Sequence, residues 1–188
     1  MKREYQPIED YGLIGNLHTV GLVSKTGSLD YLPFTRFDSP TIFAALLDKE
    51  KGGYWSIAPT HKGTHYKQLY LPDTGVLLTR FFTDSGMAEL IDFMPVKKKE
   101  QNCALVRILK VIKGQMEFTM DCKPRFDYAR AEHEAKRGKD DIFFRSKGSD
   151  GYQFRLMSNQ KVSLHKGDVH GRWSLMQGET AVFAIEAV

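Results

Sequence analysis

Apolar and polar residues alternate with a period of two along most of this chain, in short runs separated by turns that contain glycine. The run from 115 to 123 shows the pattern most clearly, because Met116, Phe118, Met120 and Cys122 alternate with polar neighbours. Such alternation is typical of a strand with one buried and one solvated face. Cys122 falls on the buried side, so we expect a reduced, buried thiol there.

Several pairs of such runs flank short turns and therefore predict β-hairpins. The pairs are Thr19–Ser24 with Leu29–Phe34, Val76–Thr83 with Met87–Phe93, Ala104–Ile112 with Gln115–Lys123, and Asp141–Ser146 with Tyr152–Met157. The runs Lys161–Lys166, Gly171–Met176 and Thr180–Ala187 predict the last strands. Gly27, in the first turn, is expected to have a left-handed backbone, which glycine adopts freely. Short strands at near-regular spacing predict an all-β fold, an antiparallel β-sandwich.

Two segments break the strand pattern. After Ser39, a residue that can cap a helix, Pro40 occupies a first helical position and alanines and leucines follow. This order predicts one short helix from Pro40 to about Leu47. The charged segment 130–139 is predicted to be either a surface loop or a frayed helical turn, with the loop favoured. No linker or internal repeat divides the chain, so we expect a single domain over residues 1–188.

Composition and charge limit the classes of partner. Of the 188 residues, 41% are hydrophobic and 27% charged, as in an ordinary soluble globular domain. The net charge of +4 is mildly basic, and the one tight basic run, Lys97–Lys99, is closed by Glu100 and lacks interleaved aromatic residues. We therefore expect a solvated loop there and no nucleic acid partner, which leaves an RNA-binding sandwich as the least favoured function.

The first residues, the length of the apolar runs and the cysteine content bear on the cell compartment. No charged-then-apolar leader opens the chain, and no run of about 18 apolar residues could span a membrane. The two cysteines do not make a disulfide framework. We expect a cytoplasmic protein without membrane contact.

A series of short motifs is more specific than strand packing requires. In chain order they are Ile8–Tyr11, Leu13–Gly15, Gly27–Tyr31, Arg36–Pro40, Phe43–Leu47, Gly53–Trp55, Asp92–Val96 and Arg125–Tyr128. Together they resemble the start of glycoside hydrolase family 15 proteins, the glucoamylase and trehalase group. Three positions depart from that resemblance: Tyr31, Thr35 and Ala129 stand where the family often has tryptophan, proline and glycine respectively.

The resemblance implies that the chain is the β-sandwich part of such an enzyme and does not contain its catalytic residues. In that family an all-β supersandwich precedes an (α/α)6 barrel, which carries both catalytic glutamates. The chain is therefore expected to be the non-catalytic N-terminal domain of an inverting α-glucoside hydrolase, inactive alone and without metal or cofactor. Its expected partners are the barrel of the same polypeptide and, through the full enzyme, an α-glucoside such as trehalose or a starch-like glucan. The side made for the barrel predicts an exposed apolar patch and homo-oligomerisation.

Arg36, Phe37 and Asp38 are the first candidate site. An arginine fork and a carboxylate can bind sugar hydroxyls, and Phe37 can cover the apolar face of a sugar ring. From residue types alone a structural role is favoured, in which Asp38 or Ser39 caps the helix and Arg36 pairs with a nearby acid. The resemblance implies that this loop faces the barrel and lines the rim of the sugar pocket.

Arg125, Phe126, Asp127 and Tyr128 are the second candidate. They follow Pro124 at the end of a strand and are predicted to be a structural or interdomain element. In the structural case, an Arg–Asp pair would lock the corner and Tyr128 would pack beneath it.

Other chemistry is less favoured. Glu9, Asp10 and Asp30 form an acidic set, but nothing in their spacing places two carboxylates on either side of a glycosidic bond. His61 and His65 fall in a predicted loop without a third ligand at zinc spacing, so no metal site is expected.

A free-standing carbohydrate-binding module is the alternative function. It needs an exposed aromatic platform, for which Trp55 and Trp173 are the candidates. Both tryptophans lie in strand contexts, where such residues are more often part of the core. No phosphate loop, dinucleotide fingerprint or nucleophile motif points to another class of enzyme.

Overall fold

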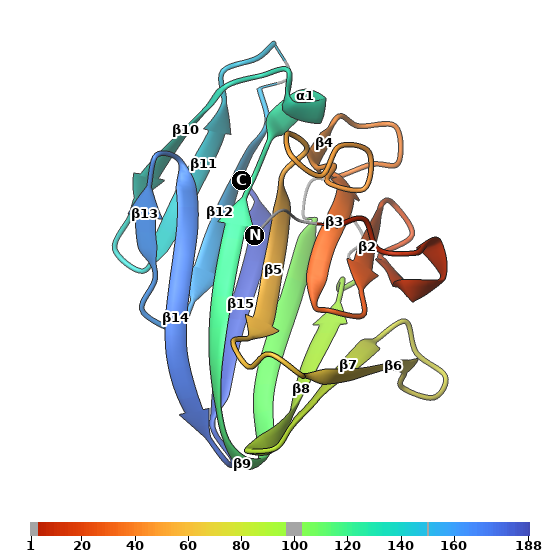
Figure 1. Ribbon diagram of the computed structural model, residues 1–188. Coiled ribbons are helices and arrows are strands. Elements are labelled where there is room, and N and C mark those ends of the chain that lie inside the picture. The colour runs from red at the N-terminus through yellow and green to blue at the C-terminus, as the bar shows by residue number, and fades with distance from the viewer. Residues whose placement is uncertain (1–3, 97–102, 150) are drawn as a thin grey trace.

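The computed structural model describes residues 4–96, 103–149 and 151–188 and is built almost entirely of antiparallel strands (Figure 1). The strands form two layers that share one long strand, β9 (Ala104–Lys123). The predicted all-β sandwich is confirmed. The basic run Lys97–Lys99 lies outside the described residues.

The first layer contains the N-terminal strands and the C-terminal half of β9. In spatial order it consists of β1 (Tyr11–Gly15), β2 (Val20–Ser24), β3 (Ser28–Pro33), β5 (Tyr54–Pro59), β9, β14 (Asp168–Met176) and β13 (Ser163–His165). The short β4 (Thr41–Phe43) pairs with β3.

The second layer is built on the N-terminal half of β9. Its order is β6 (His65–Tyr70), β7 (Leu77–Thr83), β8 (Gly86–Phe93), β9, β15 (Thr180–Ala187), β12 (Gln153–Ser158), β11 (Asp141–Ser146) and β10 (His133–Arg137). The described helices are the 3-10 turn η1 (Ile8–Asp10) and the four-residue α1 (Phe126–Ala129).

The hairpin predicted at Lys113 and Gly114 is wrong, because β9 continues through both residues. Gly114 has a φ of +73°, and a Cβ there would lie 2.0 Å from the carbonyl oxygen of Ser85. The glycine therefore allows a close approach to the β7–β8 turn, beside a register shift at Met87 and Ala88. The two halves of β9 do not pair with each other, since each finds its partners in a different layer.

The helix predicted from Pro40 to Leu47 is also wrong, because β4 and a turn occupy this segment. Its backbone groups bond to other segments: Ala44 N–H donates to Gly52 C=O (2.7 Å), and Ile42 C=O accepts from Arg125 N–H (2.8 Å). Ile42 and Phe43 are fully buried, so core packing overrides the local helix signal. The loop predicted at 130–139 is likewise corrected, since β10 pairs there with β11.

A fully buried arginine joins the two layers. Arg107, on the N-terminal half of β9, donates Nε to Asp92 Oδ1 (2.7 Å) and Nη2 to Asp92 Oδ2 (3.2 Å). Its Nη1 donates to Trp55 C=O on β5 (2.5 Å), and its Nη2 also reaches Gly27 C=O in the β2–β3 turn (2.8 Å). Gly27 has the left-handed backbone predicted for it, with a φ of +86°. Both charges of the buried pair are thus paired and hydrogen-bonded.

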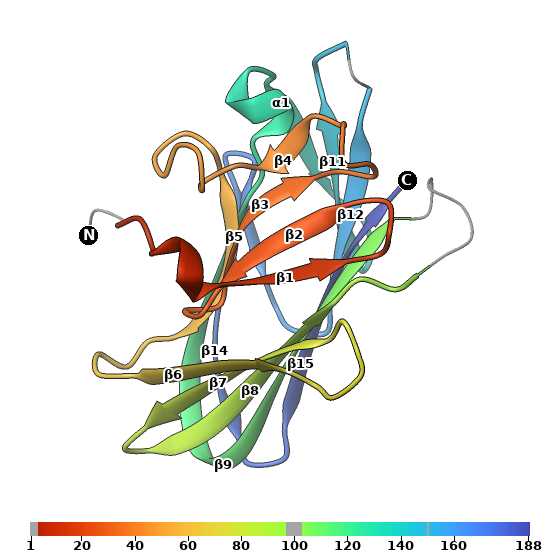
Figure 2. The same ribbon diagram turned by 90° about the vertical axis from the view of Figure 1, so that its right-hand side faces the viewer.

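At each side of the sandwich, a few side-chain hydrogen bonds connect the edge strands of the two layers. On the β1 side, the Tyr70 hydroxyl accepts from Leu13 N–H (2.7 Å) and donates to Leu13 C=O (2.8 Å), which connects the edge strand β1 to β6. On the opposite side, His133 Nε2 donates to Gly167 C=O (2.9 Å) and Arg137 to Val162 C=O (2.7 Å). Figure 2 looks onto the β1 side, with β1, β2, β3 and β6 toward the viewer.

Replacing Arg107 tests this bridge. Arg107→Met leaves the Asp92 carboxylate buried without its partner, so we expect the free energy of unfolding to fall by about 3–5 kcal/mol. Arg172→Met is the matched control, because Arg172 pairs with Glu117 (2.8 Å) on the exposed face and should cost less than about 1 kcal/mol. Guanidinium denaturation measures both, and equal losses would contradict the bridging role.

Candidate functional site

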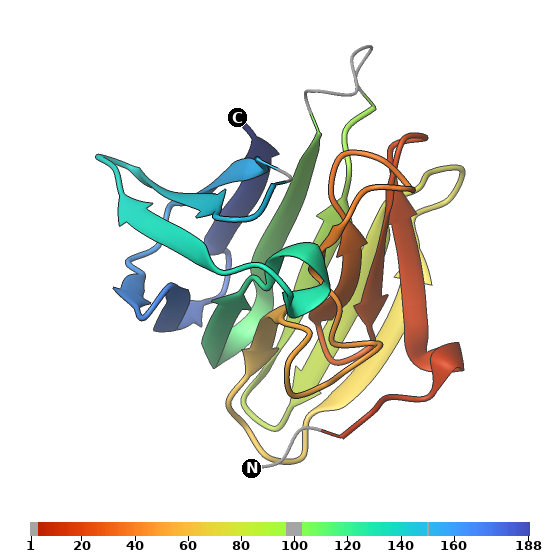
Figure 3. The same cartoon turned by 90° about the horizontal axis from the view of Figure 1, so that it is seen from above.

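The two candidate motifs lie toward the same end of the sandwich, the upper end in Figure 1. Arg125 N–H bonds to Ile42 C=O, so the corner at 125–128 is attached to β4, which follows the loop that carries Arg36, Phe37 and Asp38. Seen from above in Figure 3, α1 lies between the β3–β4 side and the β10–β12 side. The fold thus places two segments that are far apart in sequence at one end.

The Arg36–Asp38 loop presents an aromatic ring beside an ion pair. Arg36 Nε donates to Asp38 Oδ1 (2.9 Å) and Nη2 to Oδ2 (3.3 Å). Hydrogen bonding from Arg36, followed by its charge, lowers the pKa of Asp38, so the pair stays ionised at neutral pH. Phe37 between them is 61% exposed. The predicted pairing of Arg36 with an acid is confirmed, whereas helix capping by Asp38 or Ser39 is wrong because no helix follows.

The β1–β2 turn completes this site. Leu17 and His18 line a shallow hollow of about 290 Å³ together with the Arg36–Asp38 loop, and Leu17 is 82% exposed. Both Leu17 and Thr35 have positive φ values, +73° and +81°. Sequence reasoning missed Leu17 and His18, because only the pairing of β1 with β2 and of β2 with β3 brings the two turns together.

The corner at 125–128 divides into an anchored part and an exposed part. Arg125 donates to both oxygens of Asp168 on β14 (2.6 and 3.1 Å), and Phe126 is fully buried and stacks on Phe154 with ring centroids 5.7 Å apart. Asp127 instead pairs with Arg130 (2.5 Å). The predicted Arg–Asp lock exists with an unexpected partner, but Tyr128 is not packed beneath it, since 41% of its surface is exposed.

The backbone of this corner is strained. Asp127, Tyr128 and Ala129 have φ values of +50°, +55° and +64°, the left-handed region that L-residues with side chains avoid. Each such residue costs roughly 1–2 kcal/mol. Ala129 therefore adopts a glycine-like conformation at the position where the family resemblance has glycine. The bend is kept at the expense of strain.

Two of the three acids near the N-terminus, Asp10 and Asp30, are engaged in structural contacts. Asp10 forms an ion pair with Lys25 (2.5 Å), and the buried Asp30 accepts from Tyr11 (2.8 Å) and Ser28 (2.5 Å). Such contacts hold strands together and give these carboxylates a role other than acid–base catalysis. Within residues 4–96, 103–149 and 151–188, no group of three or more His, Cys, Asp or Glu side chains could hold a metal ion.

The two tryptophans do not form an exposed platform. Trp55 is fully buried under the Arg107 guanidinium, and Trp173 is half-buried against Phe183. Burial raises the pKa of the Cys122 thiol far above its usual range, which confirms the buried thiol predicted there. Trp55 and Cys122 are therefore inaccessible to a ligand, and Trp173 is only partly exposed.

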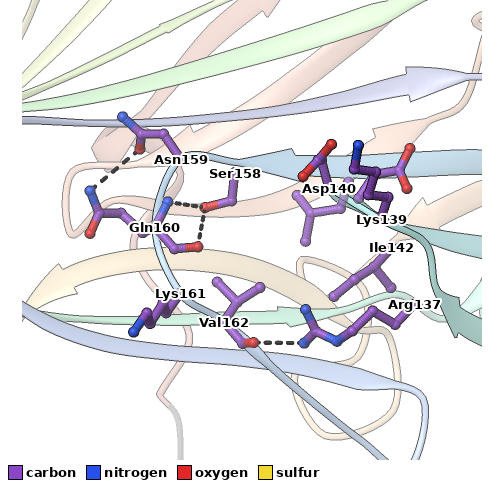
Figure 4. A pocket seen from close by; sticks show the side chains of 11 residues that line it. Arg137, Lys139, Asp140, Ile142, Ser158, Asn159, Gln160, Lys161 and Val162 are labelled. Atoms are coloured by element: carbon purple, nitrogen blue, oxygen red, sulfur yellow. Dashed lines mark hydrogen bonds between the residues drawn. The ribbon is translucent and has the colours of Figure 1, made fainter.

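A polar cleft that sequence reasoning missed lies on the side of the sandwich where Arg137 bonds to Val162 (Figure 4). Its volume is about 470 Å³, and it lies between the β10–β11 turn and the loop after β12. Ser158 and Gln160 are bonded to each other across the loop, while Arg137 fixes Val162. The lining residues include charged and amide side chains but no aromatic ring, so the cleft lacks a surface on which a sugar could stack.

No helix of the described part of the chain is long and apolar enough to span a membrane.

Comparison with known proteins agrees with the motifs. A family model described as trehalase-like, N-terminal, matches residues 1–157. Trehalase 2 of Sulfolobus acidocaldarius is 32% identical over 165 residues, 84% of this chain and 27% of that protein. The trehalase of Mycolicibacterium smegmatis is 25% identical over 208 residues, 98% of this chain and 31% of that protein. The chain thus spans less than a third of the length of these curated relatives.

The strained turn makes a prediction about stability. Ala129→Gly removes the left-handed penalty of about 1–2 kcal/mol, offset by about 0.4–1 kcal/mol from the freer unfolded chain. We expect a net gain of about 0.5–1 kcal/mol in urea unfolding. Ala135→Gly, in the strand β10, is the control and should lose stability instead. A loss in both variants would mean that the turn is not strained.

Proposed function

This chain belongs to the trehalase-like N-terminal family, and from that membership we propose that it is the non-catalytic N-terminal domain of an inverting α-glucoside hydrolase of glycoside hydrolase family 15, of trehalase or glucoamylase type. Relatives named trehalase support the hydrolase association. Catalysis is assigned to an (α/α)6 barrel of the same polypeptide. The domain packs on that barrel and shapes one rim of its sugar pocket.

The exposure of Phe37 beside its ion pair carries the proposal. A phenylalanine with 61% of its surface exposed gains little from the domain's own core, so its place is better explained by a partner. The flanking guanidinium and carboxylate offer donors and acceptors to sugar hydroxyls. Because Arg36 and Asp38 neutralise each other, the rim suits an uncharged glucoside.

The distribution of exposed apolar side chains supports a docking side. Of thirteen large apolar side chains that are exposed among the described residues, eight lie between residues 5 and 71. They are Tyr5, Ile8, Leu13, Leu17, Phe37, Leu47, Tyr70 and Leu71. These residues belong to the N-terminal strands and turns, whose β1, β2, β3 and β6 lie toward the viewer in Figure 2, and we assign this side to the barrel.

A free-standing carbohydrate-binding module is the weaker alternative, because burial removes Trp55 and Trp173 as a platform. A cytoplasmic location belongs to the same proposal. It is supported by the buried thiols of Cys103 and Cys122, which are not joined in a disulfide and so suit a reducing compartment.

Phe37 tests the rim assignment in the enzyme as purified from its source cells. With Phe37→Ala we expect kcat/KM for trehalose or maltose to fall about tenfold, equivalent to about 1.4 kcal/mol of lost binding in the transition state. Phe143→Ala is the matched control, because this phenylalanine is also exposed but lies on β11, and it should leave kcat/KM unchanged. Equal activities of both variants and the wild type would rule out the rim role.

The docking side makes a separate prediction for the isolated chain. Without its partner, the apolar side should drive self-association that grows with protein concentration. Sedimentation equilibrium measures it, and Leu17→Ser combined with Phe37→Ser should shift the protein toward monomer. A monomer mass at every concentration would contradict the docking side.

A further inference from the structure

The two halves of strand β9 present outer faces of different character. In both halves the outward residues alternate with buried ones. The outward residues of the C-terminal half are polar: Glu117, Thr119, Asp121 and Lys123. In the N-terminal half, Val106 and Ile108 point outward, and both are partly exposed. An outer sheet face that meets water is normally polar, so the N-terminal half is the exception.

The apolar positions continue in register onto the neighbouring strands. One cross-strand row consists of Ile91, Ile108 and Val182. The next row consists of Phe93, Val106, Ala184 and Met157. These seven side chains are all partly exposed and alternate with buried residues of their strands. We call them the outer apolar face, which covers the four adjacent strands β8, β9, β15 and β12.

The core of the sandwich does not explain this composition. The core lies on the opposite side of the same strands, where Leu90, Leu109 and Phe183 are buried. The outer side chains therefore gain little from folding of the domain itself. Ile108 and Val182 are β-branched and stiff, which suits them to pack on a pleated surface. A contiguous apolar face of this kind marks an interaction surface.

Charged residues flank the outer apolar face, and the two sides differ in net charge. The row on one side is Lys67, Arg80, Glu89 and Lys110. This row carries three cations and one acid. On the other side Arg155 pairs with Glu186 (2.8 Å) and also reaches Asp141 (3.9 Å), so two acids accompany one cation. Over the described residues, the face is thus positive along one side and negative along the other.

We propose that a second copy of this chain binds to the outer apolar face through a two-fold axis. In such a dimer the same patch serves both copies, so it must be complementary to itself. An axis that runs along the rows, in the plane between the two stacked sheets, places the positive side of each copy against the negative side of the other. Lys110 of each copy then lies near Glu186 of the other, twice in the dimer. An axis along the strands would instead oppose like charges.

The dimer goes beyond the proposed function and does not depend on the docking side. Neither Leu17 nor Phe37 belongs to the outer apolar face. If Phe37→Ala leaves the native enzyme unimpaired while the dimer forms as proposed, the rim assignment fails and the dimer stands. If the dimer fails, the N-terminal domain assignment is unaffected.

Sedimentation equilibrium of this chain tests the apolar contact. Leu17→Ser with Phe37→Ser moves the chain toward monomer, but a dimer should remain at high concentration. Adding Ile108→Lys should complete the shift, raising the dissociation constant of the dimer about a hundredfold or more, because each dimer would bury two unpaired lysines. Ile108 points outward, so circular dichroism should show an unchanged fold.

Thr119→Lys is the matched control for this experiment. Thr119 also points outward from β9 but lies in its polar half, so the substitution should leave the dimer intact. An equal effect of Ile108→Lys and Thr119→Lys would overturn the proposal. A monomer mass of the Leu17→Ser, Phe37→Ser variant at every concentration would overturn it as well.

Charge reversal tests the orientation of the two copies. Lys110→Glu and Glu186→Lys should each weaken the dimer about tenfold, since each variant opposes like charges across its own interface. Mixed with each other, the two variants should form a heterodimer in preference, because both contacts then join opposite charges again. Native mass spectrometry, with one variant labelled with heavy nitrogen, measures the heterodimer share.

Lys123→Glu is the control for charge reversal, because Lys123 lies on the polar half of β9. Mixed with Glu186→Lys, it should give no preference for the heterodimer. The proposed orientation predicts a heterodimer share well above that of random pairing only for Lys110→Glu with Glu186→Lys. Random pairing in that mixture would overturn it.

Discussion

The structure depends on one buried charge. Arg107 lies on the strand shared by both layers, and its five-donor guanidinium binds Asp92 within one layer and the carbonyls of Trp55 and Gly27 in the other. A charged group that is buried away from water is costly unless its donors are hydrogen-bonded. Because the Arg107 donors bond to several elements, this side chain fixes the relative position of β8, β9, β5 and the β2–β3 turn. The long strand β9 changes partners near Gly114, and Arg107, seven residues earlier on the same strand, holds the two layers together.

The loops at one end of the sandwich have an irregular backbone. The Arg36–Asp38 loop and the corner at 125–128 both contain left-handed residues that carry side chains, at Thr35 and at Asp127 through Ala129. Such strain persists only where the surrounding structure determines the backbone. Here the anchors are the β3–β4 pairing and the core contacts of Phe126. The same end that stores strain presents Phe37 and Tyr128 to solvent, which is the arrangement expected of a pocket rim contributed to a partner domain.

The sequence predicts the class of fold well, because period-two alternation is a local consequence of a half-buried strand. Sequence-based prediction fails where contacts between distant segments determine the local structure. Gly114 predicts a turn, and only the different strand partners of the two halves of β9 show that the strand continues through it. The segment after Pro40 predicts a helix, but its backbone groups form hydrogen bonds with Arg125 and Gly52 instead. At the candidate site, the residue types predict that Arg36 pairs with a nearby acid, and the structure identifies that acid as Asp38. The pairing of Arg125 with Asp168 is not predictable in this way, since Asp168 lies 43 residues later in the chain.

We propose above all that this chain is the N-terminal domain of a sugar-cleaving enzyme. The most direct measurement is the intact mass of the native protein in its source cell, determined together with its trehalose- and maltose-hydrolysing activity. We expect a mass well above the 21.5 kDa of this chain, in a species that releases glucose. A mass near 21.5 kDa without hydrolysis would contradict it and would make a free-standing sandwich the leading explanation.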